Sequence, residues 1–267
     1  MPGLMTLPTF TVRRAQQSHA RSVERLASGL RINRAADDPA GLAVAEHLDA
    51  RARSLSVVRR NLMDGHALMA TLDASSGEVA NILKRLRELA VQGASETLAD
   101  DGRAYLDQER LQLVEEVDRI ANTTELFGQS WLDGAIGSLD VQAGADQGDT
   151  IELTAGDVTT GTLGIGALDF TTAAGAQGAL PTLDAALSTV NAQRSQYGAS
   201  MNRLESAMRL TDNQEMVHRA AASRIMDADM AHEAAEMARA QILMQTSVMA
   251  LRQVHQVNQQ MISALLA

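Results

Sequence analysis

The residues best suited to chemistry are His232, Glu233 and Glu236, close to the C-terminus. They belong to the sequence HEAAE at residues 232–236, which is similar to the HExxH helix of zinc proteases except that Glu replaces the second His. That metal site requires two imidazoles one helical turn apart, and this motif supplies one. The chain also has no cysteine, which excludes thiolate zinc sites, disulfides and cysteine nucleophiles. We therefore expect no metal centre at this motif.

Other patterns suited to ligands are weaker still. The GTLGIG stretch at residues 161–166 has its glycines in the wrong order for a nucleotide loop, and no helix-forming segment follows at once. Asp146 and Asp149 lack the other oxygen ligands of a calcium loop. Asp227 and Asp229 read as a helix junction, with Asp229 capping the final helix. We expect neither catalysis nor a cofactor.

Composition and charge exclude several classes of partner. The 267-residue chain has a formal net charge of −10, which argues against binding to nucleic acid or to anionic lipid. No run of eighteen apolar residues occurs, so membrane insertion is not expected. The first residues do not have the pattern of a cleaved signal peptide, so we expect a different export route if the protein is exported.

The elements that would carry any site are long helices. Between residues 44 and 90, positions alternately four and three apart are apolar except at Arg51, Gly65 and Ser76, which predicts a coiled-coil helix roughly 70 Å long. Asp38 is the predicted N-cap of this helix, and Pro39 occupies its first turn. A shorter helix over residues 10–28 precedes it, with Gly29 interrupting the pattern. Another helix follows the loop at residues 93–103.

The middle of the chain changes character. Residues 130–178 are rich in Gly, Thr and Asp, and the alternating pairs Leu139/Val141 and Ile151/Leu153 predict small β-hairpins, with a disordered linker as the alternative. Helix returns with Pro181 in its first turn, and a last helix covers residues 229–267. The fold class is therefore mainly α, a long coiled-coil rod with paired N- and C-terminal helices and a small β-hairpin region. Periodicity alone leaves open whether the terminal stripes pack within one molecule or against other copies.

Three sequence blocks resemble the bacterial flagellin family. They are ERLASGLRINRAADDPAGLAVAEHL at residues 24–48, LKRLRELAVQGASET at 83–97 and SRIMDADMAHEAAEMARAQILMQ at 223–245. The resemblance covers residues 18–132 and 181–267. It implies a secreted, non-enzymatic subunit that polymerises into the extracellular flagellar filament for motility. The alternative is a flagellin-like hook–filament junction protein, which occurs in a few copies and forms no long filament.

The resemblance also implies a division of the chain into layers. Residues 1–33 and 229–267 would form the inner layer, D0, while residues 34–132 and 181–228 would form the rod-like layer, D1. Residues 133–180 would be the β-hairpin or variable region. The junction and assembly residues carried over with the motif are Gly29, Arg31, Asn33, Asp37, Asp38 and Gly41.

Further partners follow from the same resemblance. They are other copies of the chain, the flagellar type III export apparatus, a flagellin chaperone, and the filament cap and hook–filament junction proteins. Some flagellins are recognised by Toll-like receptor 5, and the matching positions here are Arg85, Leu89 and Glu109. The alternative is that Arg85 and Glu109 only solvate the rod while Leu89 packs between protomers.

Overall fold

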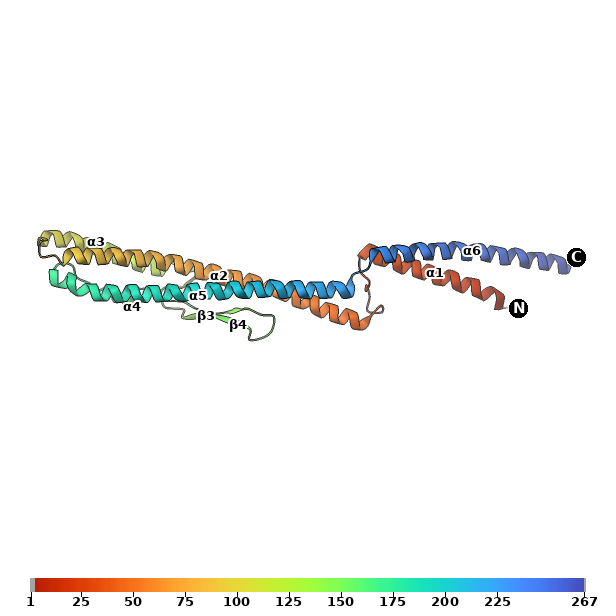
Figure 1. Ribbon diagram of the computed structural model, residues 1–267, viewed down its shortest axis with the longest axis horizontal. Coiled ribbons are helices and arrows are strands. Elements are labelled where there is room, and N and C mark those ends of the chain that lie inside the picture. Colours follow the sequence, from red (N-terminus) through yellow and green to blue (C-terminus); the bar gives the residue numbers. More distant parts are fainter. Residues whose placement is uncertain (1–2, 267) are drawn as a thin grey trace. The chain divides into compact units, whose positions relative to one another are not determined.

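The computed structural model describes the backbone of residues 3–266 and divides into two compact units. The terminal unit comprises Met1–Ala52 and Met216–Ala267, and the central unit comprises Arg53–Glu215. The outermost residues of the predicted D0 segments, Met1, Pro2 and Ala267, lie outside the described residues, as do the side chains of the predicted stripe members Met261 and Leu265. The helices are α1 (Gly3–Ser28), α2 (Pro39–Gly93), α3 (Asp100–Thr123), α4 (Thr160–Leu163), α5 (Ala173–Met226) and α6 (Met230–Leu266), and the strands are β1 (Glu125–Leu126), β2 (Gln129–Ser130), β3 (Ser138–Gln142) and β4 (Thr150–Thr154) (Figure 1).

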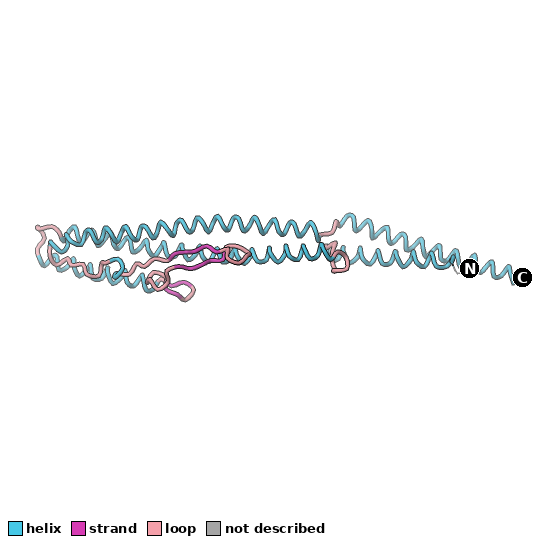
Figure 2. Tube along the Cα trace, turned by 90° about the horizontal axis from the view of Figure 1, so that it is seen from below, coloured by secondary structure: helices cyan, strands magenta, loops and turns pink. Residues whose placement is uncertain are grey.

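The central unit is built on the predicted heptad seam of α2. Its stripe positions from Leu55 to Ala90 are all buried, including the exceptions Gly65 and Ser76. The facing helix α5 buries a residue every seventh position, and α3 adds Val117 to the same core. These α5 positions are Leu183, Val190, Tyr197, Leu204 and Thr211. The predicted coiled-coil class is confirmed, and Figures 1 and 2 show these helices running alongside one another.

The stripe does not stay buried to its predicted beginning. Val44, which lies in the terminal unit, is 52% exposed. The part of the chain that the structure describes therefore does not cover this face of α2 with apolar side chains. The stripe is therefore buried in the single chain only from Leu55 onward.

The predicted hairpin is present, and it explains the glycine in the heptad seam. Strands β3 and β4 pair antiparallel with Val141 opposite Ile151 and Leu139 opposite Leu153. A Cβ added at Gly65 would lie 3.2 Å from side-chain carbons of both Val141 and Leu153. The small residue thus lets the hairpin pack closely on α2. The linker alternative for this segment is wrong.

A second, smaller hairpin was not predicted. Strands β1 and β2 pair through Leu126 and Gln129, so Phe127 and Gly128 form a two-residue turn. Both turn residues have positive φ, 57° at Phe127 and 75° at Gly128, as a type I′ turn requires. A side chain in this left-handed region costs roughly 1–2 kcal/mol relative to glycine. Phe127 is therefore held in a strained conformation.

The start of α5 differs from the prediction. The helix begins at Ala173, and Pro181 lies inside it rather than in its first turn. The Thr172 hydroxyl accepts a hydrogen bond from the Gly175 amide at 3.0 Å, which caps the new end. The predicted hairpin region of residues 133–180 therefore ends in helix.

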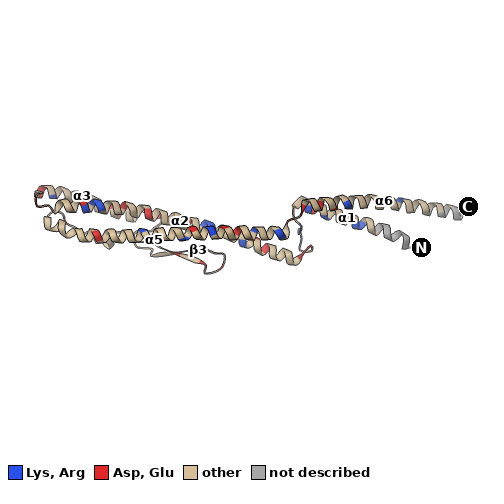
Figure 3. Ribbon diagram, viewed as in Figure 1, with Lys and Arg blue, Asp and Glu red and all other residues tan. Residues whose placement is uncertain are grey.

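In the terminal unit α1 lies against α6, as predicted for the two chain ends (Figure 1). The pair buries little: Ala15, Ser22, Glu233 and Ala240 are the buried positions among the described side chains of the two helices. Large apolar side chains remain outside, including Phe10 at 65%, Ile242 at 60% and Met249 at 60% exposed. Beyond Ala240, Arg252 is the one Lys, Arg, Asp or Glu of the chain, and Figure 3 shows the correspondingly sparse charge on the outer part of α6.

Candidate assembly junction

The end of α1 is fixed by a glycine. Gly29 has φ +73°, and its amide donates to the Arg25 carbonyl at 2.8 Å, closing the helix with a left-handed residue. The chain then leaves the helix axis, and Leu30 forms an antiparallel β-bridge with Asp227. Position 29 favours glycine because its φ is positive. Space is not the reason, since nothing lies within 4 Å of an added Cβ.

Backbone and side chain of Arg31 tie this segment to the end of α5. The Arg31 amide donates to the Met226 carbonyl at 2.6 Å, and the Ala228 amide donates back to the Gly29 carbonyl at 2.9 Å. The Arg31 guanidinium donates to the Ile225 carbonyl at 2.7 Å. A cation at a helix C-terminus satisfies free carbonyls and complements the helix dipole. Residues nearly two hundred positions apart are thus joined by backbone bonds.

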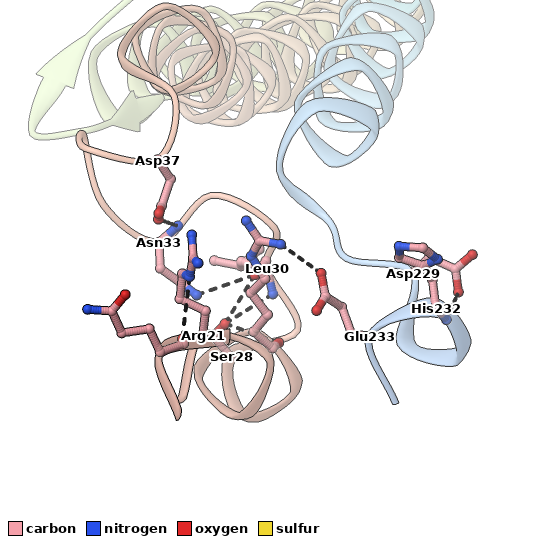
Figure 4. A network of polar contacts seen from close by, with 10 residues as sticks. Arg21, Ser28, Leu30, Asn33, Asp37, Asp229, His232 and Glu233 are labelled. Atoms are coloured by element: carbon pink, nitrogen blue, oxygen red, sulfur yellow. Dashed lines mark hydrogen bonds and ion pairs between the residues drawn. The ribbon is translucent and has the colours of Figure 1, made fainter. Parts of the chain in front are cut away.

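The loop that leads into α2 is organised by two aspartates. One Asp37 oxygen accepts from the amides of Asn33 at 3.2 Å and Arg34 at 3.1 Å, and Figure 4 shows Asp37 directed at Asn33. Asp38 accepts from the Gly41 amide at 2.9 Å, which confirms it as the N-cap of α2. A Cβ on Gly41 would clash with the capping carboxylate of Asp38, so a larger residue here would displace the cap.

The six predicted junction residues therefore meet in one region of the terminal unit. The side chain of Asn33 completes the set by donating to the Leu30 carbonyl at 3.3 Å. Their chemistry is capping and chain reversal rather than ligand binding. The predicted role in assembly is not tested by this geometry and stays a prediction.

Glu233, the centre of the HEAAE motif, has a structural role in this region. Its side chain is 8% exposed and accepts from the Arg25 guanidinium at 2.8 Å (Figure 4). Asp229 accepts from the amides of Ala231 at 2.9 Å and His232 at 3.1 Å, as predicted for the cap of the last helix. Among the described residues, no group of three or more His, Cys, Asp or Glu side chains is placed to hold a metal ion.

Sequence reasoning missed Arg25 as the partner of Glu233. The two lie 208 positions apart, and helical periodicity carries no information about pairs so distant. One usable signal existed: Glu233 falls in the first turn of its helix, and Arg25 in the last turn of α1. A carboxylate in the first turn of one helix and a guanidinium in the last turn of another each complement the helix dipole, and pairing of the two chain ends brings these turns together.

The predicted receptor residues are divided between surface and core of the central unit. The Arg85 guanidinium donates to Glu109 at 2.8 Å and to Glu88 at 3.1 Å, linking α2 to α3. These hydrogen bonds, Glu109 first, raise the pKa of Arg85. Leu89 is 1% exposed and packs in the core of the unit, so its side chain is not available as the surface anchor that the resemblance implied.

Two further arginines of α3 were not singled out from the sequence. Arg103 is buried and donates to the Gly93 carbonyl at 3.1 Å and the Ser95 carbonyl at 2.9 Å, which closes the C-terminal end of α2. Arg110 binds Asp107 at 2.6 Å, and this hydrogen bond is the main cause that lowers the pKa of the Asp107 carboxyl. The pairing of Arg110 with Asp107, three residues earlier, is local, but nothing in the sequence indicated that these arginines are buried, because arginine side chains seldom are.

These features define a structural class. Heptad seams hold the central unit, polar contacts close helix ends in the terminal unit, and the two chain ends pair as helices that keep apolar side chains outside. The described residues contain no helix long and apolar enough to cross a membrane. Such a molecule is a helical subunit of a larger assembly.

Comparisons with known proteins identify the assembly. Residues 8–136 match the bacterial flagellin N-terminal helical region, and residues 180–265 match the bacterial flagellin C-terminal helical region. The chain is 42% identical over 238 residues to a flagellin of Halalkalibacterium halodurans, covering 88% of each. It is 35% identical to a flagellar filament 30.7 kDa core protein of Treponema maltophilum, covering 87% of each. The crystal structure of Bacillus cereus flagellin matches with a TM-score of 0.53 and 35% identity, over 57% of this chain and 88% of that chain.

The chain belongs to the bacterial flagellin family, and it is a structural subunit of the flagellar filament.

Proposed function

We propose that the chain polymerises mainly through its terminal helices, with residues 1–33 and 229–267 forming the inner layer of the filament. The observation that carries this proposal is the exposed apolar surface of α1 and α6. Phe10, Ile242, Leu243 and Met249 are each more than half exposed, although they lie on helices that already pair with each other. Such surface on a soluble chain marks an interaction site.

Assembly buries enough apolar surface to contribute a sizeable favourable free energy for each copy. Burying a large apolar side chain completely contributes about 1.5–3 kcal/mol, so side chains that begin half exposed contribute roughly 1 kcal/mol each. Several such residues on two helices supply the free energy that holds a copy in the filament. The sparse charge on the outer part of α6 means that few ionic groups lose hydration when it is covered.

The remaining assignments extend this proposal. Residues 34–132 and 181–228 form the rod layer, and residues 133–180 contribute its hairpin. The protein is non-enzymatic, leaves the cell unfolded through the flagellar type III apparatus, and joins the extracellular filament beneath the cap, beyond the junction proteins. A chaperone covers α6 before export, because its apolar side chains would otherwise associate early. The lack of cysteine supports export of an unfolded chain, since no disulfide forms first.

Recognition by Toll-like receptor 5 is a separate part of the proposal. It rests on Arg85 and Glu109, whose side chains are 51% and 39% exposed and bridge two helices. Leu89 supports this surface only from beneath, through its packing. Loss of receptor binding in Arg85→Ala, with Arg87→Ala as the matched control, tests the assignment; equal binding by both variants contradicts it.

Seeded elongation tests the main proposal. Purified full-length chain added to filament fragments elongates them, which a hook–filament junction protein would not do. Removing residues 229–267 leaves a soluble, partly helical monomer, because the heptad seam of the central unit is intact. This monomer does not elongate seeds, because it lacks α6. Filaments built from the truncated chain would show that the terminal helices are not the assembly element.

A further inference from the structure

Phe127 stands out among the aromatic residues of the central unit. The chain has one Trp, two Tyr and three Phe in all. Trp131, Phe170 and Tyr197 are buried, Tyr105 is an exposed residue of helix α3, and Phe127 is 65% exposed in a turn. It also occupies a left-handed backbone position at φ 57°, which glycine or asparagine adopts with less strain. Backbone strain combined with an exposed ring points to a role that the isolated fold does not explain.

The ring borders an open groove of the central unit. The groove lies between α2 and β3, with a volume of about 390 Å³, and Gly65 and Leu68 of α2 form part of its floor. Leu139 at its edge is 37% exposed. Asp64 and Asp140 lie on the rim, so the surface is an apolar strip with acidic edges. Such a strip favours an apolar partner that carries positive charge.

A surface of this description exists elsewhere on the same unit. Val91 of α2 is 52% exposed beside Lys84, Arg87 and Glu88, which together line a shallow depression. Arg87 is paired with Asp184 and Glu88 with Arg85, whereas the Lys84 ammonium donates to the neutral amide oxygen of Asn81 at 3.4 Å. Lys84 thus carries a positive charge that these ion pairs do not use, beside an exposed valine.

We propose that the Phe127 groove of one copy lies against the Lys84–Val91 surface of a second copy, with the exposed Phe127 side chain entering the depression beside Val91. The occupant is a second copy because the two surfaces match in charge and in apolar character. They are also different surfaces of one unit, and a contact between unlike surfaces repeats from copy to copy without closing into a dimer. The inference rests on the proposed function, since it names a lateral contact inside the polymer. Phe127 is its aromatic anchor.

Phe127→Asn separates this role from a structural one. Asparagine tolerates the left-handed turn, so the depolymerised full-length variant melts at a higher temperature than the unchanged chain. Its filaments nevertheless lose the anchor, and the critical concentration for seeded elongation rises about tenfold or more. The control is Tyr105→Gln, which removes another exposed ring, 77% exposed, from an unstrained helical position and leaves elongation unchanged.

The outcomes are distinct. Failure of the unchanged chain to elongate seeds would overturn the proposed function itself. Normal elongation by Phe127→Asn, or an equal loss in Tyr105→Gln, would overturn only the anchor. A charge exchange tests the occupant: Asp140→Lys and Lys84→Asp each raise the critical concentration, and the double variant restores it. Absence of that restoration would refute the pairing of the two surfaces.

Discussion

Breaking the ion pair between Arg25 and Glu233 should open the junction of the two chain ends. The Glu233 side chain is 8% exposed and that of Arg25 is 31% exposed. Replacing Arg25 by Met leaves a nearly buried carboxylate without its cation, which costs 3–5 kcal/mol for a fully buried pair. Because the guanidinium is partly hydrated, we expect about 2 kcal/mol.

Native-state hydrogen exchange measures this loss where it occurs. The Arg31 and Ala228 amides bond across the junction at 2.6 and 2.9 Å, so they exchange only when it opens. A loss of about 2 kcal/mol accelerates their exchange roughly thirtyfold. Glu233→Gln keeps an acceptor and should accelerate it roughly fivefold, about 1 kcal/mol.

The double variant Arg25→Met/Glu233→Gln supplies the control. It removes both charges, so its effect should be smaller than the sum of the two single effects. If both amides of the Arg25→Met variant exchange within twofold of the rate in the unchanged chain, the reasoning is refuted. If the effects of the two single variants simply add in the double variant, the two side chains do not interact.

Three further predictions concern single side chains. Arg103→Met should lower the free energy of unfolding of the central unit by about 2–3 kcal/mol in a denaturant titration, since the Gly93 and Ser95 carbonyls lose a buried cation, and Arg103→Lys should lower it less. Because Arg110 lowers the pKa of Asp107, that carboxylate stabilises the fold above its unfolded pKa of about 3.9, and the contribution is lost as the pH falls through the folded pKa. Asp107→Asn should therefore reduce the fall in the free energy of unfolding at acid pH. An unchanged fall would contradict the assignment. Gly41→Ala should displace the Asp38 cap and cost about 1–2 kcal/mol by amide exchange at the start of α2, with a smaller further loss when Asp38→Ala is already present, because only the 3.0 Å contact with the Ile32 side chain then remains.

Periodicity and capping chemistry predicted most of the fold. The α2 seam, the caps at Asp38 and Asp229 and the β3–β4 hairpin each depend on neighbours within a few residues or on a repeated spacing, and a single sequence shows both. The start of α5 was wrong because Pro181 is a strong local signal for a first helical turn. The Thr172 cap upstream of it is a weaker one. Proline can be accommodated within a long helix when packing elsewhere stabilises that helix.

The candidate site could be predicted only in part. The residues of the junction were indicated by the family resemblance, but their partners were not, because bonds such as that from Arg31 to Met226 join segments far apart in the chain. For Leu89 the resemblance named the residue, but the sequence did not show whether its side chain is exposed. The family resemblance grouped it with Arg85 and Glu109 as receptor residues, yet only the packing of the central unit decides that its side chain is buried.

The terminal unit separates two tasks that assembly requires. Directional polar contacts concentrate where α1 ends and α6 begins, and there they set the register of the two chain ends within one molecule. Farther out, α6 presents apolar side chains with little charge, and these carry no register information of their own. A copy whose junction is closed therefore offers its apolar faces in one fixed alignment, and its neighbours contribute burial rather than order. It follows that Arg25→Met should slow the addition of copies while changing the final filament little, whereas loss of the outer α6 side chains should weaken the filament itself.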